Sequence, residues 1–334
     1  MDNRMWDTFL SLLRAGLWEK DVRLTQAPDE TEWGLLLQGA REQAVTGLLL
    51  RAVAHLGEDQ TPPSTVRMRL VAEADLLDRK GHRTLAAERS ILALYQGAGL
   101  HPIVQKGSRS ALHYAVPALR VSGDVDLYLP GEEFDKAVAL APGARKAPDG
   151  SYSFKQEGVT VELHPRYYDL HCDFSALPEP ASVCGELLLL SAHILKHAMG
   201  AGVGLKQLCD IARALDRCEG TYDKQELATA LENAGLMRWH TLLCSLLVED
   251  LGLDPARCLD GFTAVSPEPL RRIVREGGNF GQATEKRQKA LRNGSAFARK
   301  ASTALTFLKR LPFSLRIAPR EARATIRELV RGNL

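Results

Sequence analysis

Apolar side chains recur every three or four positions in both outer parts of the chain, whereas a central segment alternates between apolar and polar positions. The first spacing is typical of amphipathic helices and the second of half-buried strands. Early helices are expected over Trp6 to Leu13, Trp33 through Leu56 and Val66 to Leu94. Later helices are expected over Glu186 to Met199, Leu205 to Leu215, Lys224 to Ala234, Met237 to Leu251 and Pro267 to Arg275. Pro62-Pro63 separates the second helix from the third, which Ser64 or Thr65 would cap.

The most regular alternation in the central segment runs from Asp124 to Leu129. Val125, Leu127 and Leu129 take the core side of the expected strand, and Asp124 and Asp126 share the other side. Neighbouring carboxylates repel each other unless a cation lies between them, and Mg²⁺ prefers oxygen ligands of this kind. The pair is therefore a candidate metal site, with solvated surface acids as the alternative.

A second alternating strand is expected over Val159 to His164, with Glu162 and His164 on its polar side. If this strand pairs beside the Asp124 strand, Glu162 adds a third carboxylate to the first two. Two roles fit His164: a hydrogen bond to a metal-bound carboxylate or a bound ligand, or a structural role at the strand end.

The residues before the Asp124 strand form a candidate phosphate site. A short strand, Leu100 to Gln105, leads into Lys106-Gly107-Ser108, and a short helix is expected from Arg109 to Tyr114. Glycine lets the main chain approach a ligand closely, and the amides that open a helix attract phosphate. Lys106 and Arg120 are the candidate phosphate partners, with solvated surface charges as the alternative.

Two further elements complete the central segment. Glu132 to Leu140 has helical spacing, and Ser151 to Gln156 reads as a strand after a turn at residues 147–150. Strands and turns at this spacing predict an antiparallel or mixed sheet. The expected fold class is therefore α+β, with a small mixed sheet between N- and C-terminal helical regions.

The order of these elements resembles the nucleotidyltransferase superfamily of DNA polymerase beta type, and the fuller pattern resembles an uncharacterised bacterial nucleotidyltransferase family. The pattern consists of Lys106-Gly107, Tyr114, Arg120, Asp124-Val125-Asp126-Leu127 and Glu162-Leu163-His164, and continues into residues 188–197 and 205–212. The resemblance covers roughly residues 30 to 250. In one departure, Glu162 stands where many superfamily members carry Asp, although its longer side chain still reaches a metal.

The resemblance implies a metal-dependent enzyme that transfers a nucleoside monophosphate from a nucleoside triphosphate, with ATP as the expected donor. It implies Mg²⁺ or Mn²⁺ on Asp124, Asp126 and Glu162 as the catalytic and metal-binding residues. The residues expected to bind the nucleotide are Lys106, Gly107, Ser108, Arg120, His164 and Lys206. The acceptor would be a small molecule, a glycan precursor or a protein. The alternative is a non-catalytic nucleotide- or partner-binding module that retains the fold, and the presence of all three acids argues against it.

Three features of the later helical region have weaker functional interpretations. Lys206 and Asp210 hold substrate or orient the nucleotide if their helix lines the cleft, whereas a buried Asp that caps a neighbouring helix is the alternative. His193 and His197 share a helix face, but the adjacent Glu of a zinc-binding H-E-x-x-H is missing, so we expect no zinc there. Tyr167-Tyr168 is expected to pack in its loop, with stacking on a base as the alternative.

Composition adds a cellular setting and a division into units. With 334 residues and 45% hydrophobic content the chain can bury a large core. We expect units at residues 1–95, 96–182, 183–284 and 285–334. The six cysteines lack C-x-x-C spacing, which favours reduced thiols. No signal-type segment and no run of membrane-spanning length is present, so the expected location is the cytoplasm.

The last unit differs from the rest in charge. Residues 285–334, the basic tail, carry 13 basic and three acidic side chains, whereas residues 1–284 carry 30 basic and 38 acidic ones. Aromatic and aliphatic side chains interleave with the basic ones, so the tail could contact an anionic membrane surface or a nucleic acid. Packing back on the acidic body is the alternative, and we prefer it.

Overall fold

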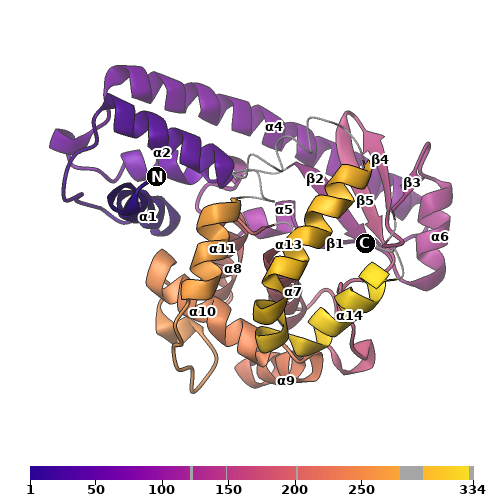
Figure 1. Ribbon diagram of the computed structural model, residues 1–334. Helices are drawn as coiled ribbons and strands as arrows, with labels where there is room; N and C mark the ends of the chain where they lie inside the picture. The colour runs from indigo at the N-terminus through magenta and orange to yellow at the C-terminus, as the bar shows by residue number, and fades with distance from the viewer. Residues whose placement is uncertain (121–122, 148, 201, 279–295, 331–334) are drawn as a thin grey trace.

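The computed structural model describes residues 1–120, 123–147, 149–200, 202–278 and 296–330, with side chains from residue 304 onward in the last range. A small sheet lies at one side of the molecule, and helices from both ends of the chain occupy the rest (Figure 1). This arrangement confirms the predicted α+β class, in which a small mixed sheet lies between helical regions.

Most of the predicted helices and strands are present near their predicted positions. The helices before and within the sheet segment are α1 Asn3–Trp18, α2 Glu30–Glu42, α3 Thr46–Val53, α4 Ser64–Gly97, α5 Ser108–Ala111 and α6 Gly131–Ala139. The later helices are α7 Val183–Met199, α8 Leu205–Arg217, α9 Lys224–Ala234, α10 Met237–Leu251, α11 Glu268–Gly277, α13 Ala296–Ile317 and α14 Pro319–Val330. The strands are β1 Ile103–Val104, β2 Asp124–Tyr128, β3 Arg145–Lys146, β4 Tyr152–Gln156 and β5 Val159–His164.

The sheet has the strand order β1-β2-β5-β4-β3, and its two central strands, β2 and β5, run parallel. The outer neighbours are antiparallel. In the central pair Asp126 lies opposite Glu162, and Tyr128 lies opposite His164. Residues two apart on a strand share a face, so Asp124, Asp126, Glu162 and His164 project from one side of the sheet.

The opposite face of the sheet is apolar and packs on α4 and α6. Val125, Leu127, Val161 and Leu163 are at most 1% exposed and share a core with side chains of these helices, including Ile91, Tyr95 and Phe134. Burial of each such side chain contributes on the order of 2 kcal/mol. This packing fixes which face is buried, and therefore leaves the acidic face directed away from α4 and α6.

Helix α4 takes part in two separate cores. Val66 and Leu70, near its start, belong to a large core with α1 to α3 and the helices from α7 to α11. Ala87, Ile91 and Tyr95, further along, belong to the core of the sheet. The N-terminal helices thus share a core with the C-terminal bundle, although the sheet segment separates them in sequence. The predicted boundaries at residues 95, 182 and 284 stay a prediction.

Two helix predictions from the N-terminal region are wrong in detail. Residues 33–56 form two helices, α2 and α3, with a break at which Ala44 takes a left-handed φ of 56°. The apolar spacing continues across this break because both helices pack on one core. Neither Ser64 nor Thr65 caps α4: the N-cap position is Pro63, and Ser64 is already the first helical residue. Thr65 instead donates to Glu30.

Differences within the sheet segment have similar local causes. The predicted strand at residues 100–105 is reduced to β1, and the predicted helix at 109–114 to the four residues of α5. Strand β3 is not predictable from the sequence, because its two residues, Arg145 and Lys146, are both exposed and show no apolar alternation. These shorter elements still place Lys106 and Gly107 directly after β1.

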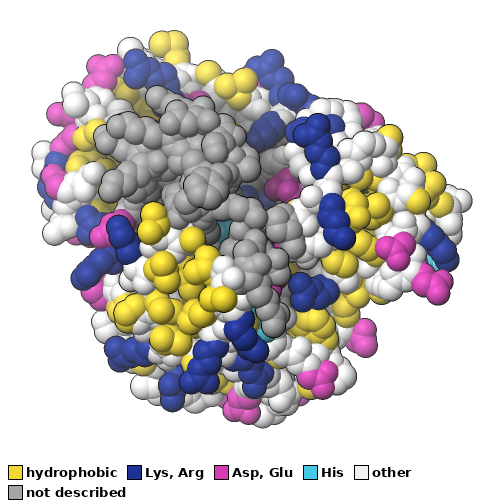
Figure 2. All heavy atoms as spheres, turned by 45° about the vertical axis from the view of Figure 1, so that its right-hand side comes forward, with side chains coloured by type: hydrophobic (Ala, Val, Ile, Leu, Met, Phe, Trp, Pro, Cys, Tyr) yellow, Lys and Arg dark blue, Asp and Glu magenta, His cyan; other side chains and the backbone are white. Residues whose placement is uncertain are grey.

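The described part of the basic tail packs on the body of the protein. Phe307, Ala318 and Ala322 are buried. Arg310 donates to the carbonyls of Ala198 and Gly200, at the end of α7 where the helix dipole favours a cation. The exposed basic side chains are Lys309, Arg316, Arg320, Arg323 and Arg327. Basic and hydrophobic side chains lie next to each other on the face shown in Figure 2. Residues 285–295 and 331–334 lie outside the described residues, and within the described part no helix has the length and apolarity needed to cross a membrane.

An ionic contact joins α14 to the loop after β5. The main-chain N–H of His171 donates to Glu321 at 2.9 Å, and its ring faces Glu321 at 2.7 Å and Glu328 at 3.1 Å. The hydrogen bond with Glu321 raises the pKa of His171 to about 9, and it outweighs partial burial. His171 is therefore a cation at neutral pH and holds the tail helix through two carboxylates.

We expect this contact to make stability depend on pH. A pKa raised by folding adds stability that is fully present below the ordinary histidine pKa, about 6.5, and is lost as the pH rises through the folded value of about 9. The difference in unfolding free energy between wild type and His171→Asn should therefore shrink across this range, by at most on the order of 3 kcal/mol. Urea unfolding of both proteins at several pH values measures it, and a constant difference would contradict the assignment.

Candidate active site

The acidic face of the sheet lines a cavity of about 340 Å³. Strands β2 and β5 form one wall, α7 and α8 form the opposite wall, and the segment after β1 contributes a third side. The charged and histidine side chains that line it include Lys106, Arg120, Asp124, Asp126, Glu162, His164, His193, Lys196, His197, Lys206 and Asp210. The volume lies within the range of pockets that hold small ligands.

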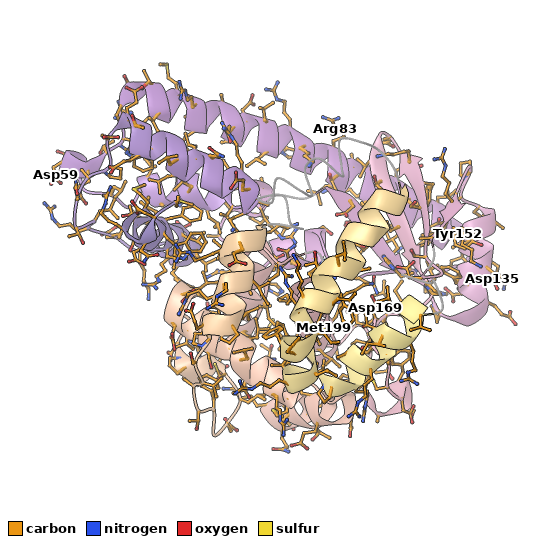
Figure 3. The ribbon with its side chains drawn as sticks, in the orientation of Figure 1. Asp59, Arg83, Asp135, Tyr152, Asp169 and Met199 are labelled. Carbon is orange, nitrogen blue, oxygen red and sulfur yellow. The ribbon has the colours of Figure 1, made fainter. Side chains whose placement is uncertain are left out.

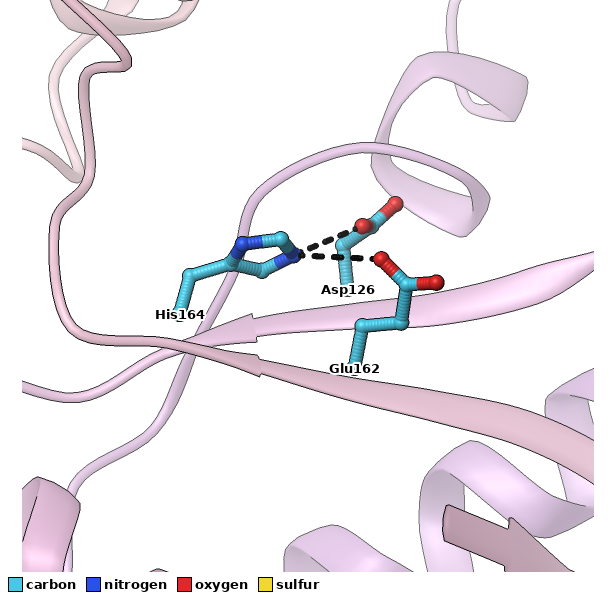
Figure 4. A group of neighbouring side chains, drawn as sticks. All are labelled: Asp126, Glu162 and His164. Carbon is cyan, nitrogen blue, oxygen red and sulfur yellow. Dashed lines mark hydrogen bonds and ion pairs between the residues drawn. The ribbon is translucent and has the colours of Figure 1, made fainter. Parts of the chain in front are cut away.

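Three potential metal ligands meet at the floor of this cavity. Within the described residues, Asp126, Glu162 and His164 form a group whose ligand atoms lie within 4.8 Å of one another. The Nε2 atom of His164 is 2.9 Å from Oδ1 of Asp126 and 3.8 Å from Oε2 of Glu162 (Figure 4). The parallel register of β2 and β5 produces this meeting, because it sets the two acids side by side and the histidine one pleat further along.

Asp126 is held in its charged form. Its residue is 6% exposed, and burial by itself would favour the neutral acid. The ammonium of Lys106, 3.3 Å from Oδ1, and the ring of His164 outweigh burial and lower the pKa of Asp126 well below its usual value. This carboxylate is therefore ionised at any pH at which the protein would work.

Glu162, in contrast, is shifted toward its neutral form. Burial raises the pKa of its carboxyl, and the negative charge of Asp126 raises it further, whereas His164 opposes both effects. Two carboxylates that share one site resist simultaneous ionisation. A divalent cation between them would remove this repulsion.

Asp124 lies on the same face, but at the edge of the group. It begins β2, pairs in register with Thr160 and is exposed, and it lines the same cavity. The group of ligand atoms within 4.8 Å does not include it in the described part of the chain. The sequence places all three acids on one face, whereas the structure brings Asp126 and Glu162 close together and leaves Asp124 at the rim.

The segment after β1 has divided roles. Gly107 has φ 70° and ψ −109°, a conformation that strains residues with a side chain, and it lines the cavity. The hydroxyl of Ser108 points elsewhere, because it donates to Glu88 of α4 at 2.6 Å. Burial raises the pKa of Glu88 and is opposed by this hydrogen bond. Any phosphate contact from Ser108 would therefore come from its main chain.

Arg120 is committed to a buried ion pair. Its Nε and Nη2 atoms each donate to Asp210 at 2.7 Å, and the hydroxyl of Tyr114 donates to the same carboxylate at 2.8 Å. Both charged side chains are 5% exposed. Asp210 therefore ties the segment before β2 to α8. Neither of the two roles predicted for this residue, helix capping or a free contact with substrate, describes this ion pair. The sequence predicts that Arg120 contacts phosphate, but it does not show that Asp210 already neutralises the charge of this guanidinium.

Lys206 provides the contrasting case on the same helix. It lines the cavity, and the structure assigns it no side-chain hydrogen bond or ion pair within the described residues. Burial, then repulsion by Arg120, lowers the pKa of Lys206 to about 8, although Asp210, Asp124 and Asp126 attract its charge. A partly buried ammonium that lies near several acids, but is bonded to none of the described side chains, is suited to receive an anionic ligand.

Helix α7 contributes residues whose place sequence reasoning missed. His193 lines the cavity, and burial, followed by the charge of Lys106, lowers its pKa well below the usual value. The rings of His193 and His197 contact each other edge to face, with their centroids 4.4 Å apart. Lys196 forms an ion pair with Asp169, another residue of the cavity wall. The four-residue spacing identifies the shared helix face, but only the tertiary fold shows that this face lies opposite the acidic strands.

The two tyrosines after β5 pack in their loop, as predicted from the sequence. Tyr167 and Tyr168 are each 4% exposed, and their rings meet edge to face with centroids 4.9 Å apart. The hydroxyl of Tyr168 donates to the carbonyl of Pro178. Both residues border the cavity, but their rings are largely covered by protein.

The donor set fits a divalent cation. Carboxylate oxygens from two residues and an imidazole nitrogen lie at separations that two ligands of one ion can reach. The ammonium of Lys106, 3.3 Å from Asp126, shows that this position attracts positive charge. The residues present are therefore compatible with a metal-assisted reaction.

Comparison with known proteins agrees with this geometry. The chain matches a family model described as "Uncharacterised nucleotidyltransferase" over residues 29–251, which is more than half of its length. No curated protein and no solved structure matches it significantly. The matched range runs from the start of α2 to the end of α10 and contains Asp126, Glu162 and His164. The chain belongs to the uncharacterised nucleotidyltransferase family.

Proposed function

We propose that this protein transfers a nucleoside monophosphate from a nucleoside triphosphate to an acceptor in a metal-dependent reaction. One observation carries the proposal: the parallel pairing of β2 and β5 brings Asp126 and Glu162 together in a cavity whose opposite wall holds Lys206, an ammonium with no ion-pair partner among the described residues. Membership of the family supports the same reaction class. Such a cavity offers acids for a metal and a cation for phosphate.

Asp124, Asp126 and Glu162 are the proposed residues for Mg²⁺ or Mn²⁺. When bound, the metal would offset the negative charge of the triphosphate and favour the ionised form of the acceptor. The rim position of Asp124 suits a residue that completes the site together with the nucleotide. Glu162, whose pKa is raised, would lose its proton more readily beside a cation.

The remaining residues have proposed roles in binding the nucleotide. Lys106 and Lys206 would each face phosphate oxygens, and Gly107 would let the main chain of Gly107 and Ser108 approach them. Arg120 would act mainly by position, since its bond with Asp210 holds the segment before β2 in place. His164 fixes the orientation of Asp126 through its 2.9 Å contact.

We expect nucleotide binding to add a proton to Lys206. An anionic phosphate near this ammonium should raise its pKa from about 8. Binding of α,β-methylene ATP with Mg²⁺ at a pH slightly above this value should therefore take up a proton, which calorimetry in buffers of different ionisation enthalpy detects. Uptake should disappear in Lys206→Met and persist in Lys136→Met, which alters an exposed lysine of α6. Equal proton uptake in both variants would show that Lys206 is not the group that gains a proton beside the phosphates.

The acceptor and the base preference require a direct screen. Each of the four nucleoside triphosphates is incubated with Mg²⁺ or Mn²⁺ and a metabolite or protein extract, and pyrophosphate release is measured. Mass spectrometry then searches the extract for small molecules, glycan precursors or proteins that have gained one nucleoside monophosphate. Release with at least one triphosphate, ATP first, supports the proposal. Nucleotide binding without release under all conditions would favour the alternative, a non-catalytic module that retains the fold.

We also propose a cellular location and a surface contact for the tail helices. A cytoplasmic location would supply nucleoside triphosphates. The exposed basic side chains of α13 and α14 would provide a peripheral contact with an anionic membrane or a nucleic acid, which added salt should weaken. The packing of Phe307 and Ala318 on the body supports the structural alternative for these helices.

A further inference from the structure

The position of His164 within the acidic group differs from that of a supporting residue behind it. Its Nε2 atom faces Asp126 at 2.9 Å and also approaches Glu162 at 3.8 Å, so the ring points between the two carboxylates (Figure 4). A histidine that only orients one acid would need a single contact. The side chain is 19% exposed, which leaves its ring partly open to the cavity.

The backbone explains why this ring is well placed. His164 ends β5 opposite Tyr128, one pleat beyond the pairing of Asp126 with Glu162. All three side chains leave the same face of two hydrogen-bonded strands, so their separations are set by the sheet and not by a flexible loop. Rigid strands suit a metal site because the ligand positions are fixed before the ion binds.

We propose that His164 is a direct metal ligand, so that the site prefers a transition-metal dication, represented by Mn²⁺, over Mg²⁺. Mg²⁺ binds almost entirely through oxygen, whereas an imidazole nitrogen suits the first-row transition metals. Two carboxylates and one imidazole form a mixed donor set that Mg²⁺ would use only in part. This inference rests on the metal-binding part of the proposed function, and it adds the chemical class of the ion.

The ligand can be tested without any assay of activity. The full chain is titrated with Mn²⁺ alone, and electron paramagnetic resonance gives the free and bound fractions. Pulsed measurements on the bound ion then detect ¹⁴N coupling, which arises from a directly coordinated imidazole. We expect coupling in the wild type and in His82→Gln, which alters an exposed histidine of α4. We expect it to be absent in His164→Gln.

Affinities supply the second measurement. Loss of His164 should weaken Mn²⁺ binding by at least about tenfold, while Mg²⁺, measured by competition, should change much less. A histidine that acted only on the orientation of Asp126 would weaken both ions together and would show no nitrogen coupling. The wild-type spectrum decides this point even if His164→Gln folds poorly.

The outcomes separate this inference from the proposed function. Bound Mn²⁺ without nitrogen coupling in the wild type would overturn His164 as a ligand and leave the nucleotidyltransferase proposal intact. Equal affinities for Mg²⁺ and Mn²⁺ would overturn the preference. Nitrogen coupling that disappears in His164→Gln would support the inference even if no nucleoside triphosphate released pyrophosphate, a result that would count against the proposed reaction alone.

Discussion

Asp126→Asn should lower turnover at least about a hundredfold, because the substitution removes one charge from the centre of the metal site. Asn has nearly the same shape, so the effect should come from charge and not from repacking. Asp126 is the most buried acid of the group, and its lowered pKa keeps it ionised. A loss of about 3 kcal/mol in transition-state stabilisation corresponds to that rate factor.

The same substitution should have a smaller effect on stability. Lys106 and His164 lose a charged partner, which destabilises the fold, but Glu162 loses a repulsive neighbour, which offsets part of the loss. Pyrophosphate release and thermal unfolding, each with and without metal and nucleotide, measure both effects. Asp135→Asn is the matched control, since Asp135 lies on the outer side of the sheet region (Figure 3). Similar turnover in the two variants would show that Asp126 is not part of the catalytic site.

Asp210→Ala should destabilise the protein by about 3 to 5 kcal/mol, because it leaves the buried charge of Arg120 without a partner. Both nitrogen–oxygen contacts of this pair are 2.7 Å, and both side chains are 5% exposed. Burial opposes the charged form of Arg120, but Asp210 more than compensates and raises the pKa of the guanidinium. Tyr114 would also lose the acceptor of its hydroxyl.

Denaturant unfolding of Asp210→Ala is best compared with Asp59→Ala. Asp59 lies at the edge of the molecule far from the sheet (Figure 3) and forms an exposed ion pair with Arg23, and such pairs contribute at most about 1 kcal/mol. The double variant Arg120→Met with Asp210→Leu should recover much of the loss, since no charge is then buried alone. If Asp210→Ala and Asp59→Ala lost equal stability, the Arg120–Asp210 pair would not hold the segment before β2 to α8 as its geometry indicates.

Arg120 and Lys206 show where sequence reasoning succeeds and where it stops. Both are predicted to contact nucleotide, and both line the cavity. Among the described residues Arg120 is ion-paired and Lys206 is not, because Asp210 bonds Arg120, 90 positions earlier in the chain. Asp210 does not bond Lys206, although the two lie four residues apart on α8. Local spacing identifies the charged helix face, whereas the choice of ion-pair partner depends on tertiary packing.

The strand alternation was more informative because its period is short and its apolar half is buried. Val125 and Leu127 fix one face of β2, so Asp126 must occupy the other. The parallel register with β5 was not predictable from either strand alone, and it is this register that brings Glu162 and His164 to Asp126. For the same reason the sequence could not show that Asp124 would remain at the rim.

Transfer of the α-phosphoryl group with its nucleoside can be distinguished from transfer of the γ-phosphoryl group by the position of a label in the donor. Wild type and Asp126→Asn are incubated with the active nucleoside triphosphate, labelled at the α or at the γ phosphorus, with Mn²⁺ and an acceptor extract. We expect wild type to move the α label into the acceptor and to release the γ label as pyrophosphate, and Asp126→Asn to do neither. Transfer of the γ label to the acceptor, or equal α-label transfer by both proteins, would contradict nucleoside monophosphate transfer at the Asp126 site.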